Sequence, residues 1–367
     1  MKHTIAAIAI LAAAAIPAAA QTTQRITAGK ASEYGLTYSL PLTAVDITVE
    51  AEISESKPGE FHNYARRHLA INDAIHAPAH TAAIRSVTIR THGEPDPDSQ
   101  WLVQFKSGTS PFMTLSEQGL PLSVNTDADA AGAGVDTEGL PVSRPAAPTA
   151  LETEAARQAV TQEMTRSSSL SKRAELAAQR IFELREMRSD ILGGQAENTP
   201  PDGQAMKLIL DNIAAQEAAL TAMFAGTTAT RTEVRTLTIV PDSADTDSRV
   251  LARISPVEGI IDADNLAGAP LTVSITATRR AELPLTDKGE PKRFPKGGFA
   301  YTIPGEATVA VSYGGQTVAT AIVSLAQLGT VFGIDPAVFT DKKAPSALRL
   351  DPATGAIISL EPVGNQR

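Results

Sequence analysis

The chain contains no cysteine, which excludes several kinds of site and anchor at once. A disulfide framework, a thiolate metal ligand and a thiol nucleophile all require cysteine. A lipoprotein also needs a cysteine at the cleavage point of its leader, so we expect no lipid anchor. Aromatic residues are scarce, at 4% of the chain with one tryptophan and five tyrosines. They leave few side chains for the stacking platforms of sugar-binding sites, and we expect Trp101 to pack in a sheet.

Long apolar runs are lacking except at the N-terminus. Residues 5–16 are apolar, Lys2 precedes them, and Pro17 with three alanines follows. This layout predicts a signal peptide at residues 1–20, because the run is too short to span a bilayer and small residues suit a signal peptidase. We expect the mature chain to begin at Gln21 and to be exported, either to the periplasm or to the cell surface and medium.

A second uncharged stretch covers residues 307–334. Gly314 and Gly315 interrupt it, and its flanks alternate polar with apolar residues. This pattern predicts a β-hairpin and not a membrane helix, so we expect no transmembrane segment in the mature chain.

Basic runs are absent, and acidic residues outnumber basic ones. The formal net charge is −9, with a pI of about 5.3. Removal of the leader with Lys2 makes the mature chain one unit more negative. An acidic chain of this kind is unsuited to bind nucleic acid or anionic lipid.

Residues 21–118 are predicted to form an N-terminal β-rich domain. Val45, Ile47 and Val49 alternate with polar residues, which is typical of a half-buried strand. The same patterns predict a helix at residues 60–69, strands at 84–91 and 101–105, and a turn at 93–99.

Residues 119–149 are rich in Asp, Ala, Gly and Pro, a composition that predicts a flexible connection. Residues 150–226 are predicted to form an antiparallel helical hairpin, because apolar residues recur every three or four positions. Ser167-Ser168-Ser169 is expected to cap one helix, and Gly193-Gly194 to end it. The next helix is expected to start at Asp202 as its N-cap.

Residues 227–367 contain many short alternating segments, which indicate a C-terminal antiparallel β-sandwich. A final hairpin is expected between residues 348 and 360, with its turn at 351–355. The predicted fold class is therefore α+β, with an N-terminal β-rich domain, a helical hairpin and a C-terminal β-sandwich.

Several short blocks occur in a fixed order along the chain. They are Tyr38-Ser39-Leu40-Pro41, Lys57-Pro58-Gly59, Tyr64-Ala65, Leu184-Arg185-Glu186-Met187-Arg188, Pro201-Asp202-Gly203, Asp262-Ala263-Asp264-Asn265-Leu266-Ala267-Gly268 and Tyr301-Thr302-Ile303-Pro304-Gly305. Through these blocks the chain resembles an uncharacterised family of exported Bacteroidota proteins, domain-of-unknown-function family 4831. The resemblance covers residues 35–361 and implies an envelope protein of Bacteroidota, with no activity, cofactor or catalytic residue attached.

Five of the six histidines lie between residues 62 and 92. His76 and His80 have helical ligand spacing, but Pro78 between them is incompatible with a regular helix. A metal site needs imidazoles that converge on one ion. We therefore predict packing or surface roles for these histidines and no bound metal or other cofactor.

Ser169-Leu170-Ser171-Lys172 matches the S-x-x-K pattern of penicillin-binding enzymes. The accompanying S-x-N and K-T-G-like patterns occur in reverse order along the chain, so we interpret the match as a coincidence. None of the esterase, zinc-protease, P-loop or dinucleotide patterns is present, and no catalytic residue is assigned.

Arg188 and Glu217 fall on the apolar seam of the predicted hairpin, where hydrophobic residues are expected. They are interpreted as residues that fix helix register through an ion pair, or as partner-binding residues. Arg185 and Asp202 join them as candidate register or partner-binding positions.

The sequence favours a non-catalytic envelope protein that binds other macromolecules or acts as a scaffold. Its partners are expected to be envelope proteins or glycans. The alternative is a periplasmic hydrolase acting on an envelope polymer, with a site built from residues distant in sequence. A deep pocket with paired carboxylates, or a Ser–His contact, would favour the hydrolase.

Overall fold

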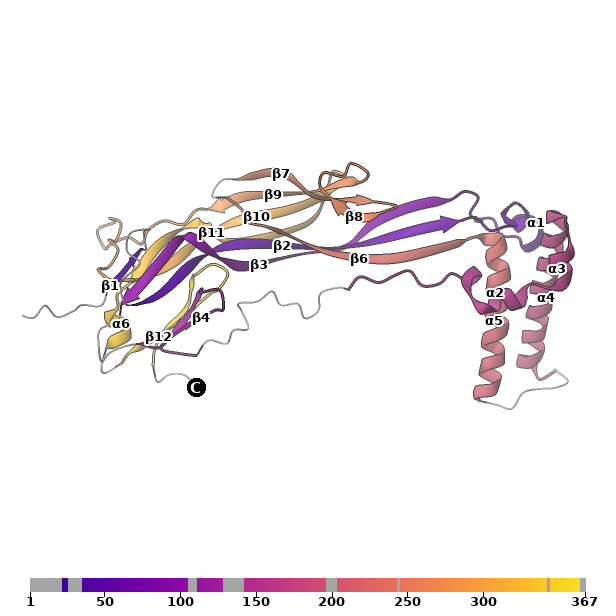
Figure 1. Cartoon of the computed structure of the whole chain (residues 1–367), viewed down its shortest axis with the longest axis horizontal. Coiled ribbons are helices and arrows are strands. Elements are labelled where there is room, and N and C mark those ends of the chain that lie inside the picture. Colours follow the sequence, from indigo (N-terminus) through magenta and orange to yellow (C-terminus); the bar gives the residue numbers. More distant parts are fainter. Residues whose placement is uncertain are drawn as a thin grey trace, which may run out of the picture.

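The protein is elongated, with β-sheets at one end and a group of helices, here called the head, at the other (Figure 1). This computed structural model describes residues 22–25, 35–104, 111–127, 142–195, 203–242, 245–341 and 344–363. Three long strands run from the sheets to the head. The predicted α+β class, with an N-terminal β-rich part, central helices and a C-terminal sheet, is confirmed.

The long strands belong to a four-stranded sheet, here called sheet A, with the order β1-β3-β2-β6. Its strands are β1 (Thr22–Arg25), β2 (Leu36–Lys57), β3 (Ala79–Gln104) and β6 (Thr227–Ile239). At roughly 3.3 Å per residue, the 22 residues of β2 span about 70 Å. The ends of β2, β3 and β6 at residues 54–57, 79–81 and 227–230 form a three-stranded stalk that carries the head.

The C-terminal strands form a five-stranded antiparallel sheet, here called sheet C, with the order β11-β10-β9-β7-β8. Sheets A and C face each other across one apolar core, with the N-terminal strands and β6 in one layer and the remaining C-terminal strands in the other. Val45, Ile47 and Val49 lie in this core and are fully buried, as their alternation predicts. The strands of sheet C are β7 (Thr246–Ser255), β8 (Gly259–Asp262), β9 (Ala269–Arg279), β10 (Phe299–Tyr313) and β11 (Gln316–Ile334).

A third sheet, sheet B, closes the end of the molecule opposite the head, here called the base. Its order is β13-β12-β5-β4, and the short helix α6 (Ala337–Thr340) lies beside it. Sheet B shares a second apolar core with sheets A and C. Its strands are β4 (Met113–Leu115), β5 (Pro121–Val124), β12 (Ser346–Leu350) and β13 (Ile357–Pro362).

The head has its own apolar core, distinct from the two cores of the sheets. Two long helices, α4 (Leu170–Gly193) and α5 (Gln204–Ala225), form the predicted antiparallel pair. Ser169 caps α4 by accepting a hydrogen bond from the Lys172 amide, and Gly194 ends it in a left-handed conformation, as predicted. The smaller elements are η1 (His62–Tyr64), α1 (Ala65–Leu69), η3 (Ala150–Glu152), α2 (Glu154–Ala159) and α3 (Gln162–Arg166).

Three predictions of local structure are wrong. α5 starts at Gln204 with Gly203 as its N-cap, and not with Asp202 as predicted. Residues 93–99 are not a separate turn, because β3 continues through them. Pro95 pairs with Pro41 and Gln100 with Ser39, so the intervening residues of β3 form a wide irregularity in the pairing. Pro121–Val124 fall within the predicted flexible connection but form the buried strand β5, which pairs with β4 and β12.

The outward face of sheet A carries a ladder of polar side chains. On β2 and β6, Thr48 bonds Thr236 at 2.9 Å, while Ser54 and Ser56 bond Thr230 and Thr228 at 3.0 Å. Cross-strand pairs of this kind add to the backbone hydrogen bonds of a sheet. They continue into the stalk, where they connect β2 and β6 directly below the head.

The predicted turns in the C-terminal half are confirmed. Gly314 and Gly315 have φ of 58° and 80° and connect β10 to β11, and Gly355 has φ of 72° in the turn before β13. None of the helices in the described ranges is long and apolar enough to cross a membrane.

Candidate functional site

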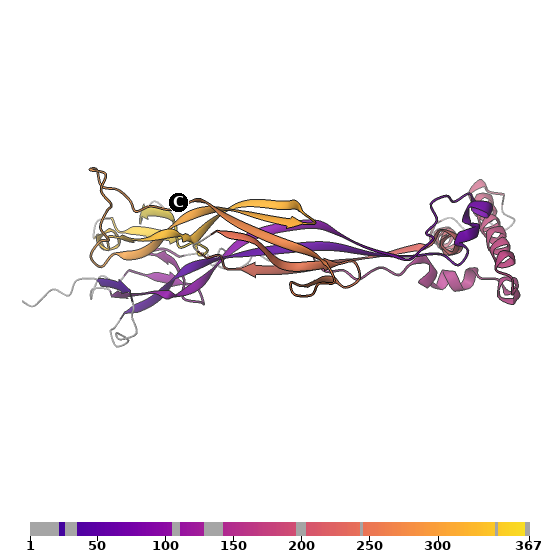
Figure 2. The same ribbon diagram turned by 90° about the horizontal axis from the view of Figure 1, so that it is seen from above.

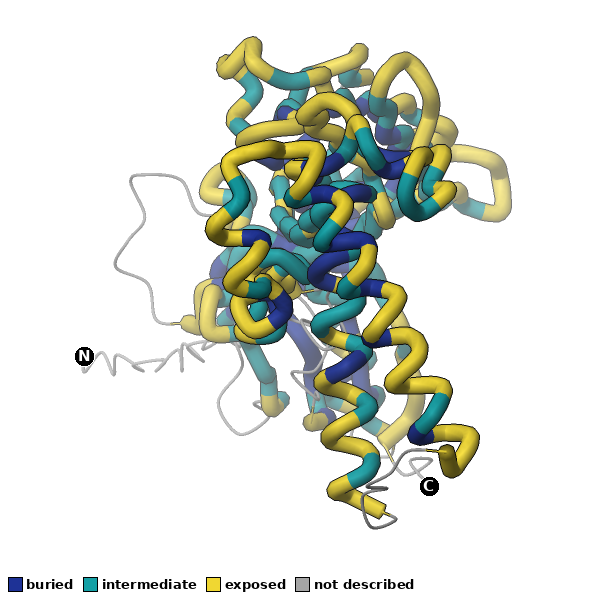
Figure 3. The backbone as a smooth tube through the Cα atoms, turned by 90° about the vertical axis from the view of Figure 1, so that its right-hand side faces the viewer, coloured by how far each residue is buried: buried dark blue, intermediate teal, exposed yellow. Residues whose placement is uncertain are grey.

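The candidate site is the free end of the α4–α5 hairpin, which we call the hairpin tip (residues 185–194 and 204–212). Figure 3 shows the two helices running beyond the smaller helices of the head, with mostly exposed residues along this part. At the other end of the hairpin, Ile181, Leu184, Leu220 and Phe224 are buried in the head core. The hairpin is thus anchored at one end and presented to solvent at the other.

Large apolar side chains are exposed at the tip. Leu192 on α4 is 64% exposed, and Leu208 and Ile209 on α5 are 71% and 39% exposed. Among the described residues of the tip, Ile191 is the one buried apolar side chain, and Ile213 is buried just beyond it. Apolar side chains gathered on a projecting element are typical of a protein-binding surface, because their exposure stabilises nothing in the free chain.

The three described candidates, Arg185, Arg188 and Glu217, come together on this hairpin. Arg185 Nε donates to Glu217 Oε1 at 2.6 Å, and Arg188 Nη1 lies 3.9 Å from Glu217 Oε2. Glu217 is mostly covered, with 17% of its side chain exposed, whereas both arginines are about half exposed. The ion pairs connect α4 to α5 where the apolar seam is interrupted. Asp202, the fourth candidate, lies outside the described residues.

Phe182 adds an aromatic ring beside these charges. It is 51% exposed, and the guanidinium of Arg185 lies over its ring at 5.8 Å from the centroid. A cation over an aromatic face is a favourable pair that a partner can extend by stacking. No sequence pattern marked Phe182, since it lies off the apolar seam.

The start of η3 is fixed by a capping box. Thr149 precedes η3, its backbone amide donates to Glu152 Oε2 at 2.8 Å, and these hydrogen bonds hold the pKa of Glu152 below its usual value. Arg173 on α4 pairs with Glu60 at 2.7 Å and lies over Phe61. The contacts of Arg173 connect α4 to the segment that follows β2.

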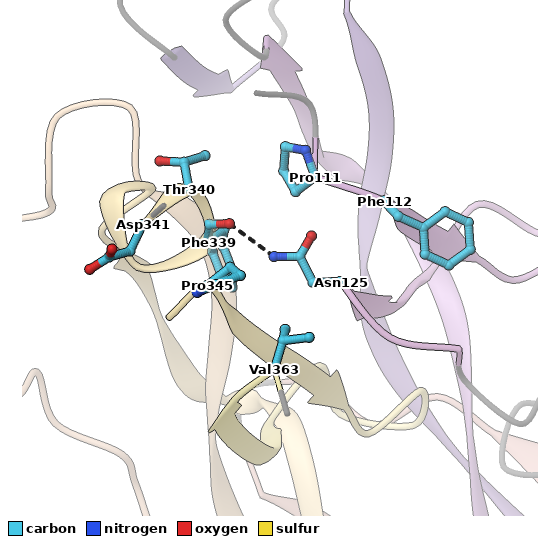
Figure 4. Close-up of a pocket in the computed structure, with 8 residues that line it drawn as sticks. All are labelled: Pro111, Phe112, Asn125, Phe339, Thr340, Asp341, Pro345 and Val363. Atoms are coloured by element: carbon cyan, nitrogen blue, oxygen red, sulfur yellow. Dashed lines mark hydrogen bonds between the residues drawn. The ribbon is translucent and has the colours of Figure 1, made fainter. Parts of the chain in front are cut away.

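A pocket of about 450 Å³ lies at the base, far from the head (Figure 4). Asn125 has φ of 59°, and its Nδ2 donates to the carbonyls of Phe339 at 3.0 Å and Ser346 at 2.9 Å. Asp341 is the sole carboxylate in the described lining, so the pocket lacks the paired carboxylates of a glycoside hydrolase. The lining residues are Pro111, Phe112, Asn125, Phe339, Thr340, Asp341, Pro345 and Val363.

One acid–histidine pair lies on the outward face of sheet A. His92 Nδ1 and Asp46 Oδ2 are 2.6 Å apart, and Thr238 donates to Asp46 Oδ1 at 2.6 Å. His92 Nε2 faces Glu94 Oε1 at 3.7 Å. A catalytic triad requires the hydroxyl to contact the histidine, whereas here Thr238 contacts the carboxylate, so the arrangement does not activate a nucleophile.

Three further histidines, His62, His68 and His76, make packing or backbone contacts. His62 Nδ1 contacts the Gly59 carbonyl at 2.8 Å, and its ring meets that of His76 edge-on at 5.5 Å. His68 packs beside Tyr64 and Phe224. In the described part of the chain, no three His, Asp or Glu side chains are grouped to hold a metal ion.

The S-x-x-K match and Trp101 also have structural explanations. Ser169 is the N-cap of α4, and Lys172 pairs with Glu175 on the same helix at 3.0 Å. Trp101 lies on β3 and stacks on Phe294 at 5.6 Å, as expected for a residue that packs in a sheet.

A family model for a domain of unknown function, DUF4831, matches residues 34–358 of the chain. No curated protein and no solved structure matches it.

Proposed function

The chain belongs to the DUF4831 family of unknown function, and we propose that it is a non-catalytic binding or scaffold protein of the bacterial cell envelope, in Bacteroidota. In this proposal the hairpin tip binds a macromolecular partner, either an envelope protein or a glycan. The base and the sandwich hold the tip at a distance.

The exposed apolar tip is the observation that carries the proposal. Leu192 and Leu208 are each more than half exposed, although the head core lies on the same two helices. A chain selected only to fold gains nothing from leucines at these positions, whereas a partner that covers them gains the hydrophobic free energy of their burial.

The stalk supports the same proposal. A binding element is useful at a distance only if its support resists bending, and sheet A reaches the head with both backbone pairing and the polar side-chain ladder. Loops of the same length would lose orientation.

Export is the part of the proposal that rests on the leader. Residues 1–20 have the three-part layout of a cleavable signal peptide. Mass spectrometry of the N-terminus from native cells is expected to find Gln21 first, in the periplasmic or outer-surface fraction. An intact Met1 in the cytoplasm would contradict it.

The hydrolase alternative finds little support in the described residues. The described lining of the base pocket has one carboxylate. Beside the Asp46–His92 pair, the Thr238 hydroxyl contacts the carboxylate of Asp46 and not the histidine. Both features lie far from the exposed apolar surface of the head.

Site-specific cross-linking tests the proposal. A photoreactive residue placed at Leu208 should capture a discrete partner in native cells, because this side chain would lie in the interface. The matched control is Leu266, which is 79% exposed in the loop between β8 and β9. Equal capture at both positions would show that the tip is not a binding surface.

A further inference from the structure

The free edge of β11 has a regular, uncharged run at Ala319–Leu325. Its pairing with β10 is irregular on either side of this run, and the Ala326 amide just beyond it donates to Thr43 Oγ1 of β2 at 3.0 Å. β11 ends the order of sheet C and pairs only with β10. Residues 307–334 contain no charged side chain, and the run Ala319–Leu325 pairs with β10 without irregularity. Unpaired edges of this length are usually protected by charge, proline or a bulge, because they otherwise pair with other chains.

The other edges among the described strands are protected in these ways. The edge of β6 is occupied at Thr232, which exchanges two backbone hydrogen bonds with Arg144 at 2.8 and 2.9 Å. β3 carries Arg85 and Arg90 along its free edge. The remaining edge strands, β1, β4, β8 and β13, have only 4, 3, 4 and 6 residues. Among the described edges, β11 is therefore distinguished by a long run without charged side chains.

We propose that β11 is a dimerisation edge, where the strand of a second copy of this chain pairs antiparallel about a two-fold axis at Ile322. Ile322 is 73% exposed, although it lies at the centre of the regular run. Figure 2 shows the yellow-orange strands of sheet C along one margin of the molecule, away from the head. Pairing there leaves the hairpin tip free.

The sequence of the run is self-complementary about Ile322. Two-fold antiparallel pairing places Ile322 opposite itself, Thr320 opposite Ser324 of the second copy, and Ala321 opposite Val323. Thr320, Ile322 and Ser324 lie on the outward face, where hydroxyl pairs would flank an isoleucine pair. Ala321 and Val323 face the sandwich core. A strand with charged side chains would find no counter-charge on this edge.

Disulfide trapping tests the register, because the chain has no cysteine of its own. In an Ile322→Cys variant the two sulfurs face each other across the axis, at a Cα separation of about 4.5–5.5 Å that suits a disulfide. In a Ser324→Cys variant the equivalent positions are four residues apart, about 13 Å. Mild oxidation should therefore cross-link Ile322→Cys and leave Ser324→Cys monomeric. Equal cross-linking of both variants would overturn the proposed pairing.

Sedimentation equilibrium over a wide concentration range tests the dimer without oxidation. The full mature chain should associate reversibly, and Ile322→Lys should weaken association by at least about tenfold, because two like charges then meet at the axis. Ile358→Lys, at an exposed isoleucine on the edge strand β13, is the matched control and should associate like the unaltered chain. A chain that stays monomeric at every concentration, or a dimer that Ile322→Lys leaves intact, would contradict the inference. Recovery of a different protein paired with β11 would also overturn it, since the second copy would then not be the occupant.

Discussion

The phenol of Tyr38 is hydrogen-bonded to both backbone groups of Ala300, which lies 262 residues later in the chain. It donates to the Ala300 carbonyl at 3.1 Å and accepts from the Ala300 amide at 2.9 Å. The ring of Tyr38 stacks on Phe299 at 5.0 Å. One side chain thus connects sheet A to sheet C inside the core of the base.

Tyr38→Phe should destabilise the protein without changing its shape. The substitution removes the hydroxyl and leaves the buried amide and carbonyl of Ala300 without this partner, at a cost of about 1–3 kcal/mol in the free energy of unfolding. Urea denaturation of the two proteins measures the difference. Tyr301→Phe, at a half-buried position nearby, is the control and should cost less than about 0.5 kcal/mol. Equal effects would show that the hydrogen bonds to Ala300 contribute little.

The same tyrosine predicts a loss of stability at alkaline pH. Burial raises the pKa of Tyr38 well above its usual value of 10.0, and it raises the pKa of Tyr301 in the same direction. Below pH 10 both the folded and unfolded states keep the proton. Above pH 10 the unfolded state releases the Tyr38 proton while the folded state keeps it, so Tyr38 lowers the free energy of unfolding by about 1.4 kcal/mol per pH unit.

Urea denaturation curves recorded at several pH values from about 8 to about 11 measure this dependence. This range lies on both sides of the usual tyrosine pKa of about 10. The slope should be smaller for Tyr38→Phe than for the unaltered chain. An identical slope in the two proteins would contradict the assignment of the effect to Tyr38.

Leu184→Ala should be among the most destabilising changes in the head. Leu184 is 1% exposed and shares the head core with Leu210 and Ile213 of α5. The lost burial and the cavity left behind should cost about 2–5 kcal/mol. Leu208→Ala, at a side chain that is 71% exposed, is the control and should cost less than about 0.5 kcal/mol. Thermal or urea unfolding of both variants decides whether the seam is packed as described.

Purified protein should contain no stoichiometric zinc. His62 and His76 meet edge-on instead of converging, and His68 packs among aromatic rings. Elemental analysis after purification without chelator should find well under one ion per chain, and chelator should leave the unfolding temperature unchanged. One ion per chain, lost on replacing His76 and His80, would contradict this reading of the histidines.

Local sequence patterns predicted those helices and strands that are determined by neighbouring residues. The alternation around Val45, Ile47 and Val49 placed the core face of β2, and Ser169 and Gly194 marked the ends of α4. These features depend on residues within one turn or strand, where pattern and structure coincide.

Contacts between distant segments were not predictable in the same way. The side-chain amide of Gln327 pairs with the backbone of Thr43 at 3.1 and 2.9 Å, where the β6 partner of β2 has ended. Strand β5 was not predicted, because the segment around it is rich in Gly and Ala. The burial of its four residues depends on pairing with the distant strand β12. The pairing of β6 with the N-terminal strand β2, which places strands from both halves of the chain in sheet A, also depends on distant contacts. The domain boundaries drawn from the sequence stay predictions.

The candidate site was predictable in part. The interruption of the apolar seam marked Arg188 and Glu217, and the structure places both with Arg185 between α4 and α5. Whether these charges set helix register or contact a partner stays a prediction. The exposed leucines of the tip were not marked as a site, because periodicity alone does not show where a helix leaves its neighbours.

Quantitative affinity capture from native cells tests the binding account most directly. The unaltered chain, Leu208→Asp and the control Leu266→Asp are compared by mass spectrometry of the recovered envelope proteins. We predict that one partner is recovered with the unaltered chain and with Leu266→Asp, and is lost with Leu208→Asp, because a charge at the tip opposes burial in the interface. Equal recovery with all three chains would contradict the account, as would polymer hydrolysis by the same preparation that His92→Ala abolishes.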